Sequence, residues 1–376
     1  SRLGGDEAQD DRVVGRLQLA VDTFAAHAVY GADTAFPRAE TVHALLVVLR
    51  RMPMLVHDSV AALRAFGEMI SRTHEGQYAL IMQLLEACLS EERRERDGAL
   101  QCLVPLDLTE LEFSPALWLA MHSDLAPLAS QIWTENALDV PSTYVSSLVP
   151  LLRHAHASVR TSAARAVGAA CALHPDTLGA LLEALRMLYH AENYSLAPEY
   201  DQYGMVIEST LGREDPWHVR VAVARAIEAS APSFRAADVV PFFVFALQPG
   251  TALSDRHEAV RHAMLEASSA VIDARGDDVL SELLSQLEAS LESEHDAVTE
   301  AAVVLLGRAA RYLPADSAHV RRVVERLLSA LRTPSELVQE AVASCLPALV
   351  RASAAAKDAV SYTHLRAHET KANLAC

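Results

Sequence analysis

Apolar residues recur every three to four positions along most of the chain, which is the spacing of amphipathic helices. The clearest example is residues 333–350. Thr333 and Glu336 form a capping-box pattern there, with Pro334 at the first helical position. A second apolar stripe runs through residues 320–331, and a short polar turn joins the two segments. The pattern predicts a helical hairpin that needs neighbouring hairpins to bury its apolar faces.

The same spacing predicts helices over much of the remaining chain. Residues 1–11 are polar and are expected to be disordered. A helical pattern follows over 12–49, with a loop at 31–38, and further helices are expected at 54–70, 78–89, 98–106, 117–121, 125–133, 144–152 and 279–291. Aromatic residues make up only 5% of the chain, which favours close-packed helices over a sheet. The predicted fold class is therefore all-α.

A repeated unit becomes clear in the second half of the chain. Similar blocks align on five valines, and a small alanine follows each valine within three to five residues (Val159, Val219, Val260, Val298 and Val338; Ala163, Ala224, Ala263, Ala301 and Ala341). The valines are 60, 41, 38 and 40 residues apart, and a period near 40 with two helices per unit is typical of HEAT repeats. We expect an α-solenoid of HEAT-type hairpins that forms a right-handed superhelix. Degenerate repeats are expected over 12–152 and clearer ones over 153–359, with an insertion near 189–212.

Charge and cysteine usage limit the kind of partner. The net charge of −17 opposes non-specific binding to nucleic-acid phosphates but leaves local basic contacts open, and we expect no sequence-specific nucleic-acid binding by this segment. No apolar run approaches the roughly 20 residues of a membrane span. The five cysteines are scattered and form no CxxC pair, which predicts core thiols in the reducing cytoplasm.

Motifs for catalysis and cofactor binding are absent from the sequence, which has no GxxxxGK[ST], GxGxxG or GxSxG pattern. We therefore predict that the chain is not an enzyme and has no catalytic residue, cofactor or metal site. His154 and His156 lie in a turn, and His257 and His262 are five residues apart on one predicted helix. Neither spacing suits a helical metal site, so these are expected to be solvated or turn histidines.

Two other groups of residues have a structural interpretation. Asp277 and Asp278 come directly after a glycine that ends a predicted helix, so we expect them to cap the next helix rather than to act as acid or base. The three tryptophans, Trp118, Trp133 and Trp217, are expected to lie in the hairpin core rather than to form a stacking platform.

The candidate binding feature is a row of arginines at one position in successive repeats. Arg160, Arg220 and Arg261 each follow an aligned valine directly. We favour the interpretation that they pair with acidic residues of neighbouring repeats. The alternative is a contact line for an acidic partner or an RNA backbone, and the sequence leaves both open.

The two ends of the chain differ from a complete native sequence in what they predict. The sequence begins at Ser1 rather than Met, so we expect an internal fragment that contacts flanking repeats end to end. Residues 360–376 lose the Ala-rich helical style, and the string SYTHLRAHET within them is typical of translated adapter DNA. We expect this tail to be non-native.

Residues 253–350 carry a resemblance to a known family. The strings ALSDRHEAVRHAMLEASSAVI, VTEAAVVLLGRAARYL and TPSELVQEAVASCLPALV resemble the large HEAT-repeat translational activator of the general amino-acid control pathway. The resemblance extends more weakly upstream to about residue 91. It places the chain before the region of that family that is similar to elongation factor three.

The resemblance implies a non-catalytic scaffold. Members of that family bind ribosomes and activate the initiation-factor-two-alpha kinase in starvation or ribosome stalling, so the expected partners are the ribosome, that kinase and other translation-factor proteins. No individual contact residue is carried over. The alternative is a generic HEAT or armadillo-type module, such as a transport receptor, a tubulin-binding array or a phosphatase scaffold.

Overall fold

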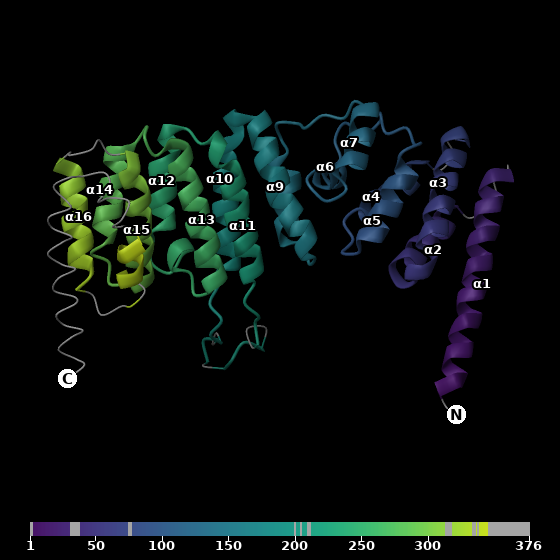
Figure 1. The fold of residues 1–376 in the computed structure, drawn as a ribbon, viewed down its shortest axis with the longest axis horizontal. Helices are drawn as coiled ribbons and strands as arrows, with labels where there is room; N and C mark the ends of the chain where they lie inside the picture. Colours follow the sequence, from purple (N-terminus) through teal and green to yellow (C-terminus); the bar gives the residue numbers. More distant parts are fainter. Residues whose placement is uncertain are drawn as a thin grey trace. The chain divides into compact units, whose positions relative to one another are not determined.

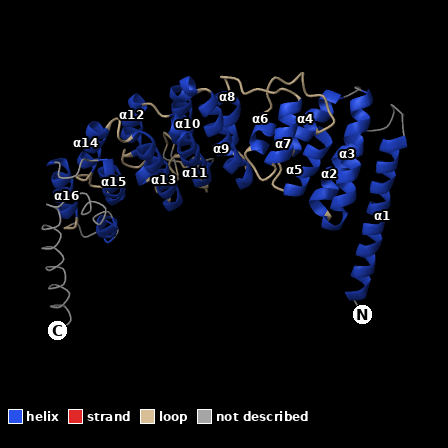
Figure 2. Cartoon of the chain, turned by 45° about the horizontal axis from the view of Figure 1, so that its top comes forward, coloured by secondary structure: helices blue, strands red, loops and turns tan. Residues whose placement is uncertain are grey.

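The structure is a computed structural model that describes residues 3–30, 38–73, 77–198, 201–203, 205–208, 212–312, 318–332, 336 and 338–344. The regular elements over these residues are α-helices and short 3-10 segments (Figure 2). The chain divides into two compact units, residues 1–166 and 167–376, and α9 (Ala157–Leu173) crosses the boundary between them. The predicted all-α class is confirmed.

The first unit contains the less regular repeats. Its helices are α1 (Leu3–Tyr30), α2 (Arg38–Arg51), α3 (Val56–Thr73), α4 (Gln77–Ala87), α5 (Arg93–Leu103), α6 (Pro115–Met121), α7 (Ala126–Glu135) and α8 (Val145–Leu148). Their core is built from Leu, Ile and Ala, with Phe66 fully buried at its centre. The helix expected at 144–152 is shorter, because Pro150 lacks a backbone N–H and the chain continues as a 3-10 turn over Val149–Arg153.

α1 begins earlier than the sequence indicates. The structure places residues 3–11 in this helix, where the sequence predicts disorder. No proline interrupts the segment, and its acidic residues lie near the helix N-terminus, where the helix dipole stabilises negative charge. Further along, α1 packs on α3 and buries Val21.

The second unit is the regular solenoid (Figure 1). After α9 come α10 (Leu178–Glu192), α11 (Trp217–Ser230), α12 (Ala236–Ala246), α13 (Glu258–Arg275), α14 (Leu280–Ser290), α15 (Asp296–Ala309) and α16 (Ala318–Ala330). The odd-numbered helices α11, α13 and α15 pack against one another in succession, and α12 packs against α14 in a second layer. Successive hairpins therefore bury each other's apolar faces.

The alignment of the repeats is confirmed by burial. The five aligned valines are at most 4% exposed, and the five aligned alanines at most 7%. A valine at this position fills the junction between hairpins, and the small alanine lets neighbouring helices approach closely. The right-handed sense of the superhelix stays a prediction.

Two predicted segments lie partly or wholly outside the described residues, and a third has a different boundary. In the hairpin expected over 320–350, Val323, Val324, Leu327, Val338, Ala341 and Val342 are buried. Residues 333–335, 337 and 345–350 lie outside the described residues, as does the whole of 360–376. The insertion expected near 189–212 begins later, because α10 continues to Glu192, and α11 begins at Trp217.

α9 and α11 approach each other closely at Gly168. A Cβ atom at this position would lie 2.5 Å from the Cβ of Ala229 and 2.6 Å from its carbonyl oxygen. A helix backbone cannot move aside as a flexible side chain can, so even a methyl group forces the two helices apart. Gly179 in α10 offers a contrast, since its nearest neighbour would be Arg235 Nη2 at 4.0 Å.

We predict that Gly168→Ala lowers the free energy of unfolding by about 1–3 kcal/mol, although alanine is the better helix former. The matched control Gly179→Ala should leave it unchanged or raise it by up to about 1 kcal/mol. Denaturant titrations followed by circular dichroism measure both. Equal effects of the two substitutions would show that Gly168 does not set the approach of the helices.

Candidate protein-binding site: the insertion and the arginine cluster at its base

At two of the aligned valines, the arginine that follows closes the turn that leads into its helix. Arg160 Nη1 donates to the carbonyls of His154 and Ala155 at 2.7 and 2.6 Å. Arg261 Nη1 donates in the same way to Asp255 and Arg256 at 2.9 and 3.4 Å. In both turns the acceptors lie six and five residues before the arginine.

In the first unit, Arg96 makes the same kind of contact with its turn. Its Nη1 donates to the carbonyls of Ser90 and Glu91 at 2.9 and 2.7 Å, again six and five residues back. Glu95 then occupies the place of the aligned valine and is buried. Residues 90–103 therefore share this contact with the blocks of Arg160 and Arg261, and their assignment as a degenerate repeat stays a prediction.

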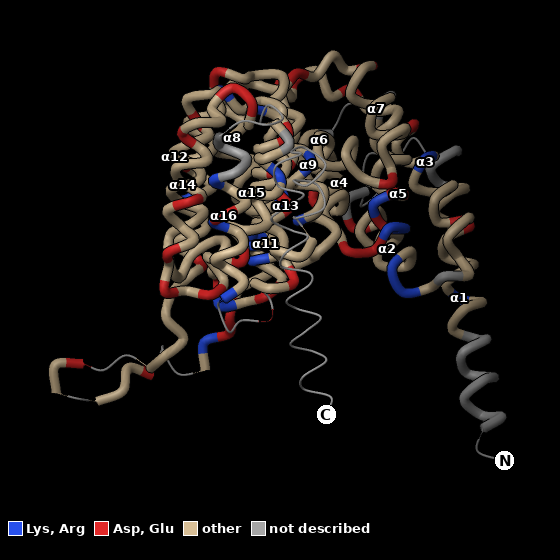
Figure 3. Tube along the Cα trace, turned by 60° about the vertical axis from the view of Figure 1, so that its left-hand side comes forward, with Lys and Arg blue, Asp and Glu red and all other residues tan. Residues whose placement is uncertain are grey.

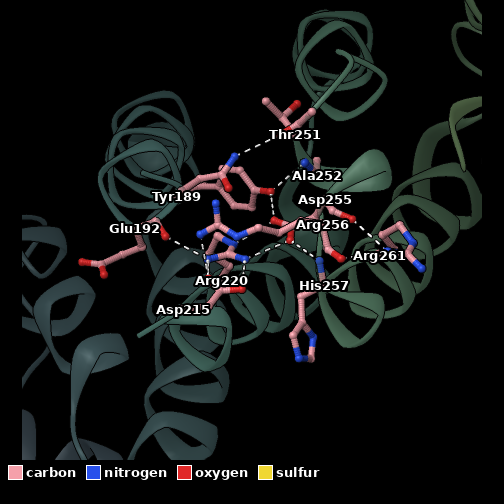
Figure 4. Close-up of polar contacts among 12 residues, drawn as sticks. Tyr189, Glu192, Asp215, Arg220, Thr251, Ala252, Asp255, Arg256, His257 and Arg261 are labelled. Atoms are coloured by element: carbon pink, nitrogen blue, oxygen red, sulfur yellow. Dashed lines mark hydrogen bonds and ion pairs between the residues drawn. The ribbon is translucent and has the colours of Figure 1, made fainter. Parts of the chain in front are cut away.

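Arg220 departs from this pattern, because its side chain is fully buried and bridges two repeats (Figure 4). Nε and Nη2 donate to the two carboxylate oxygens of Asp255 at 2.8 and 2.9 Å. Nη1 donates to Asp215 at 2.6 Å and to the carbonyl of Glu192 at 2.8 Å, and Nη2 donates to Asp215 at 3.2 Å. All five N–H donors of the guanidinium thus have acceptors.

Tyr189 completes the buried cluster. Its hydroxyl donates to the Asp255 carboxylate and accepts from the backbone N–H of Ala252 at 2.8 Å. Ala252 has a φ of 37°, in the left-handed region, and this hydrogen bond helps to hold that conformation. Burial and the hydrogen bond to Asp255 raise the pKa of Tyr189 well above its usual range, so the phenol stays a donor.

Arg256 holds both ends of the insertion to the next repeat. Nη1 donates to the carbonyl of Tyr194 at 2.7 Å, and Nη2 donates to Asp215 at 2.7 Å. Burial alone would raise the pKa of Asp215, but the hydrogen bonds and charges of Arg256 and Arg220 outweigh it and lower that pKa well below its usual range. Asp215 is therefore ionised at neutral pH.

Further contacts close the base of the insertion. Asn193 Nδ2 donates to the carbonyl of Gly250 at 3.0 Å, and the Tyr194 hydroxyl donates to the carbonyl of Glu214 at 2.9 Å. The insertion therefore leaves the solenoid between two fixed ends, and it projects beyond α10 and α11 in Figure 1.

The predicted arginine row thus divides into two kinds of residue. Arg220 pairs with Asp255 of the following repeat, as the favoured interpretation expects, and its burial removes it from any contact surface. Arg160 and Arg261 bind turn carbonyls and are half-buried. A contact line for an acidic partner or RNA stays a prediction for these two residues.

The histidines expected in turns are distributed between turns and helix ends. The Nδ1 atom of His154 accepts from the N–H of His156 at 3.2 Å, within the turn before α9. His257 lies before α13 rather than within it, because its Nδ1 accepts from the N–H of Ala259 at 3.2 Å and caps the helix. Among the described residues, no group of three His, Cys, Asp or Glu side chains is arranged to hold a metal ion.

Two further expectations differ from the structure. Trp118 is buried and Trp133 half-buried beside it, but Trp217 is 39% exposed and stacks on His257 with ring centroids 4.4 Å apart. It starts α11 at the base of the insertion, where no hairpin covers it. The N-cap residue of α14 is Val279, without a side-chain cap, so Asp277 and Asp278 do not cap that helix. Instead, Asp278 pairs with Arg275.

Cysteines and membrane spans can be assessed for the described residues. Cys88, Cys102 and Cys171 are buried, and burial raises the pKa of Cys88 and of Cys102 to about 12. These thiols act as small core residues. No helix within the described ranges combines the length and the apolar character needed to cross a membrane.

A second surface feature is a groove of about 480 Å³ between α10 and α12. Its lining is mainly apolar and includes Leu182, Phe242 and Val244. The charged residues at its rim are already paired, Glu183 with Arg186 and Asp238 with Arg235. The groove has room for apolar side chains of a protein partner, but its rim has no net charge to select one.

Sequence reasoning missed Asp255 and Tyr189 as members of the cluster. Asp255 looks like an ordinary polar turn residue in its block, and Tyr189 looks like the end of a helix. The available signal is the 60-residue interval between Val159 and Val219, because a long insertion needs polar groups that hold its two ends.

We predict that Arg220→Met lowers the free energy of unfolding of the second unit by about 3–5 kcal/mol, because it leaves Asp255 buried and unpaired. The double variant Arg220→Met/Asp255→Asn should recover part of this loss, since the buried charge is removed. Denaturant titration measures each variant. Arg225→Met, in an exposed pair with Glu228 and Glu266, is the matched control and should cost less than about 1 kcal/mol. Equal costs at Arg220 and Arg225 would contradict the account.

Comparison with known proteins agrees with the repeat architecture. A family model described as "Stalled ribosome sensor GCN1, HEAT repeats" matches residues 107–311. The human stalled ribosome sensor GCN1 is 32% identical over 236 residues, which cover 61% of this chain and 9% of that protein. For the mouse stalled ribosome sensor GCN1 the identity is 29% over 320 residues, covering 80% of this chain and 12% of the relative.

A fungal relative aligns over more of the chain. The Saccharomyces cerevisiae eIF-2-alpha kinase activator GCN1 is 30% identical over 354 residues, which cover 91% of this chain and 13% of that protein. The chain thus spans between 9% and 13% of the length of these three relatives. Because the family model matches more than half of its residues, the chain belongs to the GCN1 family of HEAT-repeat proteins.

Proposed function

We propose that this chain is a non-catalytic scaffold segment of a ribosome-associated translational activator. In this proposal the whole protein promotes activation of the eIF-2-alpha kinase when ribosomes stall or amino acids are scarce. The observation that carries the proposal is the family match over residues 107–311, together with relatives named stalled ribosome sensor and eIF-2-alpha kinase activator.

The state of the polar groups supports a role without catalysis. In the buried polar cluster, Asp215 and Asp255 are paired with Arg220 and Arg256, and the Tyr189 phenol is held protonated. General acid–base catalysis needs a group whose pKa lies near the working pH. The pKa values of Tyr189 and Asp215 are displaced away from neutrality, which suits a structural role.

The proposed mechanism is geometric. Each hairpin is held by its neighbours, so a run of repeats keeps distant surfaces at a defined spacing. Several weak contacts along such a run act together, because each later contact is intramolecular once the first has formed. The ribosome and the kinase would be engaged by the full-length chain in the cytoplasm, with this segment in contact with flanking repeats.

The generic alternative is less well supported. A transport receptor, a tubulin-binding array or a phosphatase scaffold would share the hairpin packing, but the family match names the GCN1 repeats. The long insertion between α10 and α11 also departs from the repeats of uniform length that a phosphatase scaffold predicts.

We predict that this chain can replace the corresponding segment of the yeast relative. Cells that carry the chimaera should phosphorylate eIF-2-alpha after amino-acid withdrawal, whereas cells with the segment deleted should not. Immunoblotting of phosphorylated eIF-2-alpha measures the response, and total chimaera is blotted in parallel as a control for expression. A chimaera that accumulates normally but behaves like the deletion would contradict the proposed function.

A further inference from the structure

The insertion between α10 and α11 presents apolar side chains at its outer end. Tyr203 is 81% exposed and Met205 is 68% exposed, and Val206 beside them is also exposed. Exposed apolar groups that gather at one place are characteristic of protein-binding surfaces. Tyrosine is also among the residues most enriched at the energetic centres of interfaces.

The outer end of the insertion has a defined turn. Asp201 Oδ1 accepts from the backbone N–H groups of Tyr203 and Met205 at 2.8 and 2.9 Å, and the N–H of Asp201 donates to the carbonyl of Met205 at 2.9 Å. These hydrogen bonds fold the chain back on itself, so Tyr203 and Met205 are presented together. We call residues 201–203 and 205–208 the tip.

Hydrogen bonds from two arginines hold the base of the insertion. Arg220 binds the Glu192 carbonyl before the insertion and the Asp215 carboxylate at its end, and Arg256 binds the Tyr194 carbonyl and the same Asp215. The two arginines therefore fix where the insertion leaves the solenoid. Because its two ends are fixed, the insertion loses less conformational entropy on binding than an unanchored segment would.

The charge of the insertion selects the chemistry of the partner. Residues 193–216 contain five acidic residues (Glu199, Asp201, Glu208, Glu214 and Asp215) and one basic residue, Arg213. Only Asp215 among them is neutralised by the two base arginines. Acidic positions lie along the projecting segment in Figure 3. Such a segment is repelled by RNA phosphates and anionic lipids, and it is attracted to a basic protein surface.

We propose that the tip docks on a basic protein surface of the ribosome, with Tyr203 and Met205 entering an apolar pocket on that surface. This inference rests on the proposed function, and it names the contacting element and the chemistry of its partner. The acidic residues around the tip steer the encounter, and the apolar pair supplies most of the binding energy.

A photo-crosslinking experiment identifies what the tip touches. The chain is prepared with p-benzoylphenylalanine in place of Tyr203, mixed with purified yeast ribosomes and irradiated. The expected product is a covalent adduct with a basic ribosomal protein. The same photo-reactive residue in place of Tyr78, which is 60% exposed on α4, is the control and should give no such adduct. Adducts with rRNA, or adducts equal to the control, would overturn the proposal.

A binding experiment measures what the tip contributes. The double variant Tyr203→Ser/Met205→Ser should weaken co-sedimentation with purified yeast ribosomes about 10-fold or more. The matched control Tyr78→Ser/Met82→Ser removes an exposed Tyr and Met pair from α4 and should leave it unchanged. Circular dichroism checks that both variants fold.

The outcomes separate this inference from the proposed function. If the wild-type chain sediments with ribosomes and the tip variant sediments equally well, the tip proposal is wrong and the scaffold role is unaffected. A wild-type chain that stays in the supernatant also overturns the tip proposal, whereas the proposed function is judged by the chimaera. Asp201→Asn keeps the acceptor of the turn and removes its charge, so it should weaken binding at low salt and have less effect at high salt. An increase in binding would indicate an anionic partner and contradict the proposal.

Discussion

The buried guanidinium of Arg220 joins three segments that are distant in the sequence. It binds the end of α10, the end of the insertion and the turn before α13, and each of its N–H donors has an acceptor. A buried ion pair is not in itself a strong source of stability, because desolvation offsets much of the attraction. Its effect here is specificity. The same guanidinium binds Asp255 of the following repeat and both ends of the insertion, so it links the packing of α11 on α13 to the exit of the insertion.

In other repeats, the corresponding arginine binds backbone carbonyls of its own turn. Arg96, Arg160 and Arg261 each close the turn into their own helix by binding two of its carbonyls. Arg96 also pairs with Asp124. Beside Arg160 and Arg261, the buried valine before the arginine and the small alanine after it supply the contact between hairpins. The solenoid therefore combines turns that are closed by hydrogen bonds within one repeat with packing between neighbouring hairpins. At the long insertion, contacts within one turn do not hold the two ends of the insertion. Arg220 is buried there and binds both ends and the following repeat.

Much of the fold could be predicted from the sequence, because burial repeats with the period of the hairpin. The five valines and the five alanines that follow them are apolar because they lie at the contact between neighbouring hairpins. Aligning the blocks therefore identifies ten core positions. The candidate site was harder, because its contacts are tertiary. Arg220 and Arg261 occupy the same place in the pattern, and only the position of Asp255 decides which is buried. Trp217 looks like a core residue in its block, yet the insertion leaves it uncovered. Asp277 and Asp278 are of a residue type that often caps helices, but the N-cap position of α14 falls on Val279, directly after Asp278.

The central claim is that stability passes from each hairpin to its immediate neighbours. Hydrogen exchange on a Leu287→Ala variant tests it most directly, because Leu287 is fully buried in α14 and its truncation costs about 2–5 kcal/mol. The account predicts that protection is lost first in α14 and in α12 and α15, which pack against it, while the helices of residues 1–166 keep their protection. A uniform loss of protection along the whole chain would contradict it.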